Sequence, residues 1–248
     1  MKHLLLYALV NLVASALSGA AGGGAALIGI PTLLLLGLSP TAAIASTKFS
    51  GLGLSTGTSL RFYREKLTDR RMVVILSLIS AGGAIVGSLV LVKLSSHEAL
   101  LQRIMAVAIL VVGIPMLYVR GLGLEPKNRT RPIQVLGFCL IVISVIFQAA
   151  LSSGLGSLQM VVMMACFGMT ALVANATRRF MQLTVAVISL IIFIWAGFMN
   201  YKFGVAALVT SFIGGYIGAH IAVKKGNKFV INLFAITSAL LALQLLWR

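Results

Sequence analysis

Three cationic side chains, Lys48, Arg178 and Arg179, interrupt sequence that is otherwise apolar or made of small residues. A cation at membrane depth is energetically expensive and usually faces a cavity or a binding partner. The four acidic residues of the chain all lie in or beside the connections between apolar segments, so none can neutralise these cations. An anionic ligand could do so. Alternatively, the cations lie near helix ends and extend to the lipid headgroups.

Glycines precede a short apolar segment at two places in the chain. Gly22, Gly23 and Gly24 precede residues 25–37, and Gly154 and Gly156 precede residues 157–168. A helix N-terminus has unpaired N–H groups and a partial positive charge, and glycine lets an oxyanion approach the backbone closely. The sequence therefore predicts two helix N-termini directed at one anion site. The alternative is close packing between helices at these glycines.

Hydroxyl groups near these cations and glycines could complete the hydrogen bonds of an oxygen-rich anion. For each of them alone, a bond to its own helix or a helix-packing role is the simpler interpretation. The candidates are Ser46, Thr47, Ser153, Ser157 and Thr177.

The second half of the chain repeats the first. A single ungapped alignment, called the repeat alignment below, places residues 37–49 on 168–180, Lys48 on Arg179 and Gly23 on Gly154. Internal duplication in an apolar chain is typical of transporters with one site between two pseudo-symmetric halves. We expect a first transmembrane repeat at 1–120, a cytoplasmic connection at 121–132 and a second repeat at 133–248.

The composition indicates an all-α integral membrane protein. Of the 248 residues 60% are hydrophobic and 10% are charged, and the mean hydropathy is +1.08. Apolar segments near the roughly 20 residues that a helix needs to cross a bilayer recur along the chain. We expect a polytopic helical bundle of two homologous repeats, with about eight long transmembrane helices and one short or re-entrant glycine-led helix per repeat. The long helices are expected near residues 3–21, 42–62, 72–92, 99–119, 133–153, 180–200, 203–222 and 229–247.

No polar stretch is long enough to form a soluble domain, which excludes soluble enzymes and DNA-binding proteins. The net charge of +16 comes mostly from cations in short connections, so it fits the positive-inside pattern and predicts no nucleic-acid partner. We expect a multi-pass protein of the cell membrane, the plasma or inner membrane of a prokaryote. The first apolar segment resembles a signal peptide, but its repeat partner lies in mid-chain, so we expect it to be the first helix.

The basic connections differ between the two halves. Residues 61–71 contain five cations and 192–202 contain one, whereas 93–97 contain one and 224–228 contain three. If basic connections are cytoplasmic, the halves are inverted, and the short segments must complete a crossing to give ten in all. The alternative treats the short segments as re-entrant, with eight crossings and parallel halves. Both alternatives place 61–71 in the cytoplasm.

Other candidates for chemistry are weaker. Cys139 and Cys166 lie in apolar segments without metal-ligand spacing, so we expect buried free thiols. His220 is a packing residue or a proton relay. The methionines are interpreted as core residues and not as metal ligands; they are Met160, Met163 and Met164.

The chain resembles, over essentially its whole length, the TauE/SafE family, also called the toluene-sulfonate uptake permease family. Residues 22–71 contain a glycine-rich turn, an apolar segment with a proline, an A-x-A-[ST]-x-K pattern and a basic loop in the family's order. SSGLGSLQM, ANATRRF and GFMNYKF form a looser second copy, with two arginines where the first has a lysine. The resemblance implies a permease for sulfite, organosulfonates or related anions, generally an exporter. The residues that match the family pattern are Gly23, Gly24, Lys48, Gly154, Gly156 and Arg179.

We therefore expect a secondary transporter, not an enzyme, that exports a small sulfur-containing oxyanion bound between the two repeats. No cofactor or metal is expected, and whether the chain forms a homo-oligomer is left open. The alternative is a membrane-embedded assembly or signalling subunit that binds a partner through its basic loop at 61–71. The expected substrate-binding residues are Gly23, Gly24, Ser46, Thr47, Lys48, Gly154, Gly156, Ser157, Thr177, Arg178 and Arg179.

Overall fold

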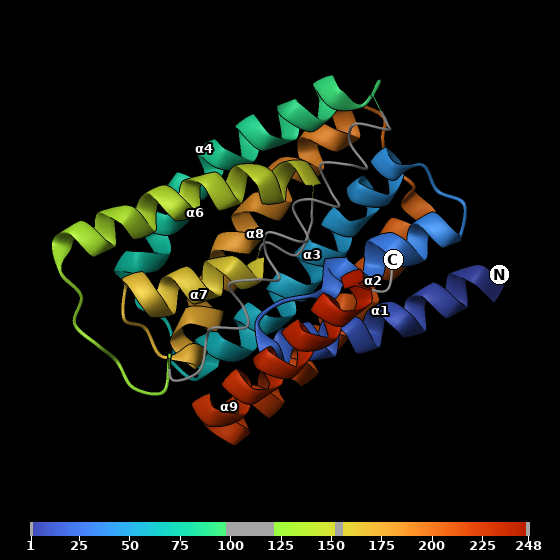
Figure 1. Cartoon of the computed structure of the whole chain (residues 1–248). Helices are drawn as coiled ribbons and strands as arrows, with labels where there is room; N and C mark the ends of the chain where they lie inside the picture. Colours follow the sequence, from blue (N-terminus) through green and yellow to red (C-terminus); the bar gives the residue numbers. More distant parts are fainter. Residues whose placement is uncertain (1, 98–121, 152–155, 247–248) are drawn as a thin grey trace.

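The computed structural model describes residues 2–97, 122–151 and 156–246, and these residues form eight α-helices. Five of the helices are long and apolar enough to cross a membrane, namely α1, α4, α6, α8 and the first part of α9, up to Thr237. The all-α class predicted from the sequence is confirmed, while the span expected at 99–119 lies outside the described residues. The helices are α1 (Lys2–Ala21), α2 (Ala25–Leu35), α3 (Pro40–Arg64), α4 (Arg70–Leu94), α6 (Arg131–Leu151), α7 (Gly156–Cys166), α8 (Ala171–Trp195) and α9 (Tyr201–Leu246) (Figure 1).

One predicted boundary was wrong. Helix α8 begins at Ala171 and not near residue 180, because the side chain of Thr170 caps it by accepting a hydrogen bond from the N–H of Val173. The spans expected at 203–222 and 229–247 correspond to two helical parts of α9, which are separated by non-helical backbone at Gly226, where φ is 78° and ψ is −176°. Helix α3 is not among the five apolar helices, because it is rich in glycine, serine and threonine; it is buried along most of its length.

Contacts between the helices show their relative directions, and glycines let the helices approach closely. Along α1 and α9, Tyr7 contacts Phe203 and Asn11 contacts Ser211, so these helices are parallel. Helix α3 is parallel to α9 as well, since its start lies near Gly204 and Arg61 lies near His220. In the same way α4 is parallel to α6, because an added Cβ at Gly83 would meet Val145 and one at Gly87 would meet Ala149. Small residues thus allow backbone contact, as in other membrane bundles.

Helices that the repeat alignment pairs have matching bounds and opposite directions. The first residues of α2, α3 and α4 align with the first residues of α7, α8 and α9. Figure 1 shows α3 and α8 running in opposite directions through the centre of the bundle. Helices α1, α3 and the first part of α9 therefore run one way, and α4, α6 and α8 run the other way.

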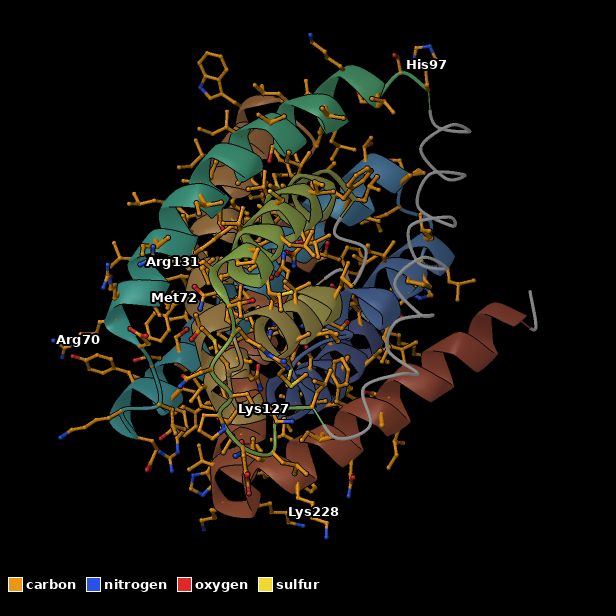
Figure 2. The ribbon with its side chains drawn as sticks, turned by 60° about the vertical axis from the view of Figure 1, so that its left-hand side comes forward. Arg70, Met72, His97, Lys127, Arg131 and Lys228 are labelled. Atoms are coloured by element: carbon orange, nitrogen blue, oxygen red, sulfur yellow. The ribbon has the colours of Figure 1, made fainter. Side chains whose placement is uncertain are left out.

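The basic residues gather at one end of the bundle, which is called the basic end below. It contains the α3–α4 turn, the residues that precede α6 and the bend of α9. Figure 2 shows Arg70, Lys127 and Lys228 toward this end and His97 at the opposite end. The basic residues of these three segments are Arg61, Arg64, Lys66, Arg70, Arg71, Lys127, Arg129, Arg131, Lys224, Lys225 and Lys228.

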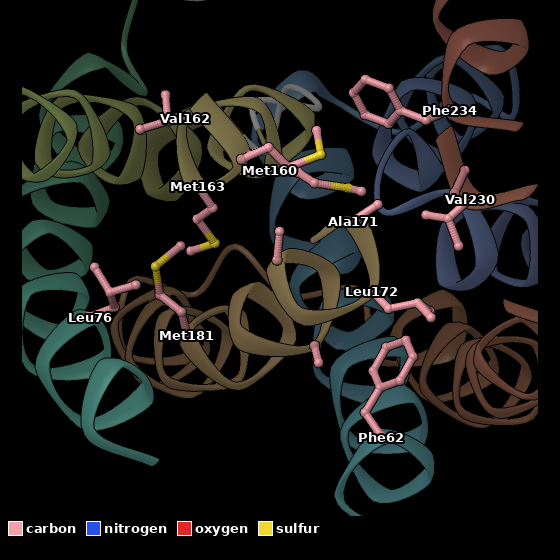
Figure 3. Packing of buried hydrophobic residues seen from close by; sticks show 14 of the residues in the cluster. Phe62, Leu76, Met160, Val162, Met163, Ala171, Leu172, Met181, Val230 and Phe234 are labelled. Carbon is pink, nitrogen blue, oxygen red and sulfur yellow. The ribbon is translucent and has the colours of Figure 1, made fainter. Parts of the chain in front are cut away.

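The larger buried apolar cluster lies between α3, α4, α6, α7 and α8, includes residues of α1 and α9, and is rich in methionine (Figure 3). Met160, Met163 and Met164 are all buried in it, which confirms their prediction as core residues. Cys166 is also buried, but Cys139 is exposed on α6, so the prediction of two buried thiols was wrong for Cys139. Outward-facing leucine, isoleucine and valine cover the long helices, as expected for a surface in lipid.

Candidate functional site

The two short helices begin at glycine turns that meet inside the bundle. Gly22 and Gly24 have φ values of 90° and 103°, which only glycine adopts readily, and Gly24 is the N-cap of α2. A Cβ added to Gly23 would lie 2.7 Å from Oγ of Ser157, at the start of α7. The N-terminus of α2 therefore packs against the N-terminus of α7, as the sequence predicted for a shared site.

Each short helix turns back toward the end at which its preceding long helix starts. Helices α1 and α3 are parallel, and α2 leads within a short turn to the start of α3, so α1 and α2 form a re-entrant pair. From the sequence, inverted halves were expected only if each short segment completes a crossing of the membrane. That link was wrong: the short helices turn back, yet the helices paired by the repeat alignment run in opposite directions.

A cavity of about 60 Å³ lies at the meeting point of the two short helices. Its walls come from α1, α2, α3, α6, α7 and α8, and therefore from both halves of the chain. Among its lining residues are six that the sequence predicted: Gly23, Gly24, Thr47, Gly156, Arg178 and Arg179. Four more predicted residues are buried but do not line it: Ser46, Lys48, Ser157 and Thr177. Gly154 and Ser153 lie outside the described residues.

Arg178 lies at the N-terminus of α7. A Cβ added to Gly156 would overlap its Nη1 atom, so the missing side chain of this glycine makes room for the guanidinium. Arg178 is 2% exposed, and its Nε and Nη2 atoms find no hydrogen-bond partner among the described residues. A cation and the positive end of a helix are thus held together in the interior, which is costly unless an anion joins them.

Lys48 and Arg179 have protein partners. Lys48 Nζ donates to the carbonyl oxygens of Gln148 and Ala149, over 2.9 and 2.8 Å, near the C-terminus of α6. Arg179 Nη2 donates to the carbonyl oxygen of Ser18, near the C-terminus of α1, and to its Oγ at 3.1 Å. The carbonyl oxygen of Ser18 also accepts from the N–H of Gly22. The last carbonyls of a helix form its negative end, so both cations stabilise helix termini. Arg179 Nε remains without a partner among the described residues.

The predicted hydroxyl groups differ in their surroundings. Thr47 donates to the carbonyl oxygen of Ile44 over 2.7 Å, and its methyl group is the atom nearest to an added Cβ at Gly29. The hydroxyls of Ser46 and Thr177, which occupy equivalent places in the repeat alignment, are buried with no partner in the described part of the chain. For Thr47, the observed role of the hydroxyl is therefore a hydrogen bond within its own helix.

Sequence reasoning missed three glutamines beside the cavity, of which Gln148 and Gln159 are buried and Gln182 is half-buried. Gln148 and Gln182 line it, and Gln159 contacts Gln148 from α7. The signal was present in the sequence, because an amide inside an apolar segment must find hydrogen-bond partners. His220 accepts a hydrogen bond from Arg61 Nε over 3.1 Å, so it is a satisfied packing residue.

The arrangement can bind a small oxyanion. Guanidinium groups, an amide and two helix N-termini surround the cavity, and its described lining residues include no carboxylate, histidine or cysteine. Among the described residues no three histidine, cysteine or acidic side chains come together as metal ligands.

Comparisons with known proteins agree with this chemistry. The family profile described as "Sulfite exporter TauE/SafE" matches residues 7–245. The chain is similar to the "Probable membrane transporter protein YfcA" of Escherichia coli K12, with 26% identity over 96% of this chain and 87% of the relative. A "Probable membrane transporter protein" of Haemophilus influenzae is 24% identical over 96% of this chain and 92% of the relative. No solved structure matches the chain.

Proposed function

Since this chain belongs to the sulfite exporter TauE/SafE family, whose members are membrane transporters and not enzymes, we propose that it exports a small sulfur-containing oxyanion such as sulfite or an organosulfonate. It is a multi-pass membrane protein. The anion binds in the central cavity between the two halves. It contacts the N-termini of α2 and α7 and the guanidinium groups of Arg178 and Arg179.

Two unpartnered nitrogen atoms of the Arg178 guanidinium are the observation that supports this proposal most strongly. Its Nε and Nη2 atoms are buried at the cavity, beside the N-terminus of α7, and have no partner among the described residues. A buried polar group without a partner costs about 1–3 kcal/mol, and more when it is charged. An oxyanion would supply acceptors to the guanidinium and to the helix N–H groups at once.

The size of the cavity favours a small substrate. Pockets for drug-sized ligands span roughly 300–1,000 Å³, whereas this one holds about 60 Å³. A three- or four-oxygen anion suits this volume, while an organosulfonate with a larger organic group requires a wider state of the transporter. Sulfite therefore fits the observed state better than an aromatic sulfonate.

The two halves act as inverted repeats around the cavity. Support comes from the helices paired by the repeat alignment, which share their bounds and run in opposite directions. Transporters of this kind expose a fixed central site to either side by moving one repeat against the other. The proposed repeats are residues 1–120 and 133–248.

The basic end faces the cytoplasm in this proposal, because basic connections remain on that side. A membrane potential that is negative inside then drives an anion outward with about 2.3 kcal/mol per charge per 100 mV. Uniport is sufficient for export, and no acidic proton carrier is needed at the site.

Anion flux into and out of proteoliposomes tests the proposal. Sulfite, sulfate, thiosulfate and several organosulfonates are compared under an imposed potential, with and without a pH gradient. We expect a saturable current for a small sulfur oxyanion, its loss in Arg178→Met, and wild-type current in Lys202→Met, whose side chain is exposed outside the site. No current for any anion, from protein shown to be folded, would contradict transport and favour the assembly subunit that binds through 61–71.

A further inference from the structure

Three glutamine side chains form a chain of hydrogen bonds that ends at the cavity. Gln159 Nε2, in α7, donates to Gln148 Oε1, in α6, over 2.8 Å. Gln148 Nε2 in turn donates to Gln182 Oε1, in α8, over 2.5 Å. Gln159 is fully buried and does not line the cavity, whereas Gln148 and Gln182 do.

The chain has a direction, and this direction decides which atoms a ligand meets. The side-chain oxygens of Gln148 and Gln182 both accept a bond within the chain. The Nε2 group of Gln182 is the donor end of the chain and makes no hydrogen bond within it. It lies 3.6 Å from the position of a Cβ added to Gly51, another lining residue. A reversed chain would instead turn the oxygen of Gln182 toward the cavity. The observed direction leaves the acceptor role to the ligand.

The other charged groups of the cavity are also donors, and its hydroxyl groups both donate and accept. Arg178 and Arg179 contribute guanidinium N–H groups without partners among the described residues. The hydroxyl of Thr47 is bonded to its own helix, and that of Ser50 is bonded to Asn11 and lies 2.6 Å from Ser211 Oγ. Within the described ranges, α1, α2, α6 and α7 contribute no titratable lining side chain, and Lys48 on α3 is turned to α6.

We propose that this donor-rich cavity prefers the fully deprotonated form of its oxyanion and that the glutamine chain maintains the preference. A protonated oxyanion has an O–H group that needs an acceptor. Among the described lining side chains the amide oxygens are already bonded, so only hydroxyl oxygens remain for it. An unpaired donor facing other donors weakens binding on the order of ten- to one-hundred-fold. Gln182 is then a specificity residue and Gln159 a positioning residue. The inference rests on the proposed function, because it concerns the same anion and the same cavity.

Binding of sulfite to the purified full-length protein at a series of pH values tests the inference. Sulfite gains a proton near neutral pH, while sulfate stays deprotonated through the same range and reports any titration of the protein itself. We expect the affinity for total sulfite to follow the deprotonated fraction, with the protonated form at least ten times weaker. The affinity for sulfate should stay constant over the series.

Gln159→Leu separates the role of the chain from that of the cavity wall. Without the Gln159 donor, the side chains of Gln148 and Gln182 are free to turn. We therefore expect the ratio of the affinities for deprotonated and protonated sulfite to fall toward one. The affinity for sulfite at high pH should change only a few-fold. Gln134→Leu is the matched control, since Gln134 donates to the carbonyl oxygen of Arg129 at the basic end and should keep the wild-type preference. Gln182→Glu adds an acceptor and should favour the protonated form.

The outcomes separate the inference from the proposed function. Equal affinity for the two forms of sulfite in the wild type would overturn the inference alone, since an anion would still bind. An unchanged preference in both Gln159→Leu and Gln182→Glu would remove the glutamine chain as its cause and overturn the inference as well. Failure of folded protein to bind sulfite or sulfate at any pH would overturn the proposed function together with the inference.

Discussion

Lys48 lies with its Nζ atom 2.8 Å from the carbonyl oxygen of Ala149, near the end of α6. Arg179, the repeat equivalent of Lys48, donates to the carbonyl oxygen of Ser18, and Ser18 is the repeat equivalent of Ala149. A cation from each half therefore binds the end of the first long helix of the other half. Because α1 and α6 end inside the bundle, this crossed arrangement supplies positive charge to the negative ends of both helices.

Replacement of Lys48 by methionine should reduce stability more than anion affinity. The carbonyl oxygens of Gln148 and Ala149 lose a charged donor, and hydrogen bonds to charged groups contribute about 1.5–3 kcal/mol. We expect the free energy of unfolding of the purified protein to fall by about 2 kcal/mol, with anion affinity per folded molecule within a few-fold of the wild type. Thermal unfolding in detergent with and without sulfite measures both quantities.

Lys202→Met is the control for that substitution, because it removes an exposed lysine with the same change of charge. It should leave the unfolding temperature unchanged. A Lys48→Met protein that unfolds like the wild type but no longer binds the anion would show that Lys48 acts on the ligand and not on the end of α6.

Arg178→Met should have the opposite effect. Arg178 has buried atoms without partners among the described residues, so its removal relieves a desolvation cost and should leave the unliganded protein as stable as the wild type or more stable. Anion binding should weaken by about 2–5 kcal/mol, the cost of removing one partner of a buried charge pair. The stabilisation by sulfite in thermal unfolding should disappear.

The comparison with Arg179→Met sharpens this prediction. Arg179 both lines the cavity and binds Ser18, so its loss should reduce both stability and anion affinity. If Arg178→Met were strongly destabilised in the absence of anion, the guanidinium would have a structural partner and its assignment to the ligand would be wrong.

Much of this site could be predicted from composition and spacing. The glycines before the short helices mark their starts because an uninterrupted helix disfavours consecutive glycines. The repeat alignment correctly indicated that Lys48 and Arg179 stand at equivalent places. Lys48 was nonetheless assigned to the ligand, because sequence contains no information about the free carbonyls at the end of a helix that is distant along the chain.

The remaining errors have physical reasons as well. Hydropathy predicted a start of α8 that is too far along the sequence, because Arg178 and Arg179 lower the hydropathy of residues 171–179. Both cations are nonetheless buried in the interior. The direction of the short helices depends on the packing of α1 against α3 and α9, and no local pattern encodes it. The glutamine chain was missed because its three members are far from one another in sequence or at spacings without helical meaning.

Gly156→Ala should reproduce the loss of Arg178. The added methyl group would overlap Arg178 Nη1 and displace the guanidinium from the N-terminus of α7. We expect anion affinity to fall at least tenfold with little change in the helix itself. Gly82→Ala is the control, because an added Cβ there meets nothing within 4 Å; as an exposed helical glycine it should be neutral or stabilising by about 0.5–1 kcal/mol. Wild-type affinity in Gly156→Ala would place the anion elsewhere.

Labelling of single cysteines from either side of the membrane should place Arg70 and Lys202 on opposite sides. Arg70 starts α4 at the basic end, whereas Lys202 lies in the first turn of α9 at the other end, and both are exposed. With Cys139 and Cys166 replaced by serine and alanine, an impermeant maleimide added to whole cells should label Lys202→Cys only, because basic connections stay in the cytoplasm. Arg70→Cys should react only in inside-out vesicles. Labelling of both residues from one side would contradict the opposite directions of α4 and α9. Labelling with the sides exchanged would reverse the direction in which the membrane potential drives the anion.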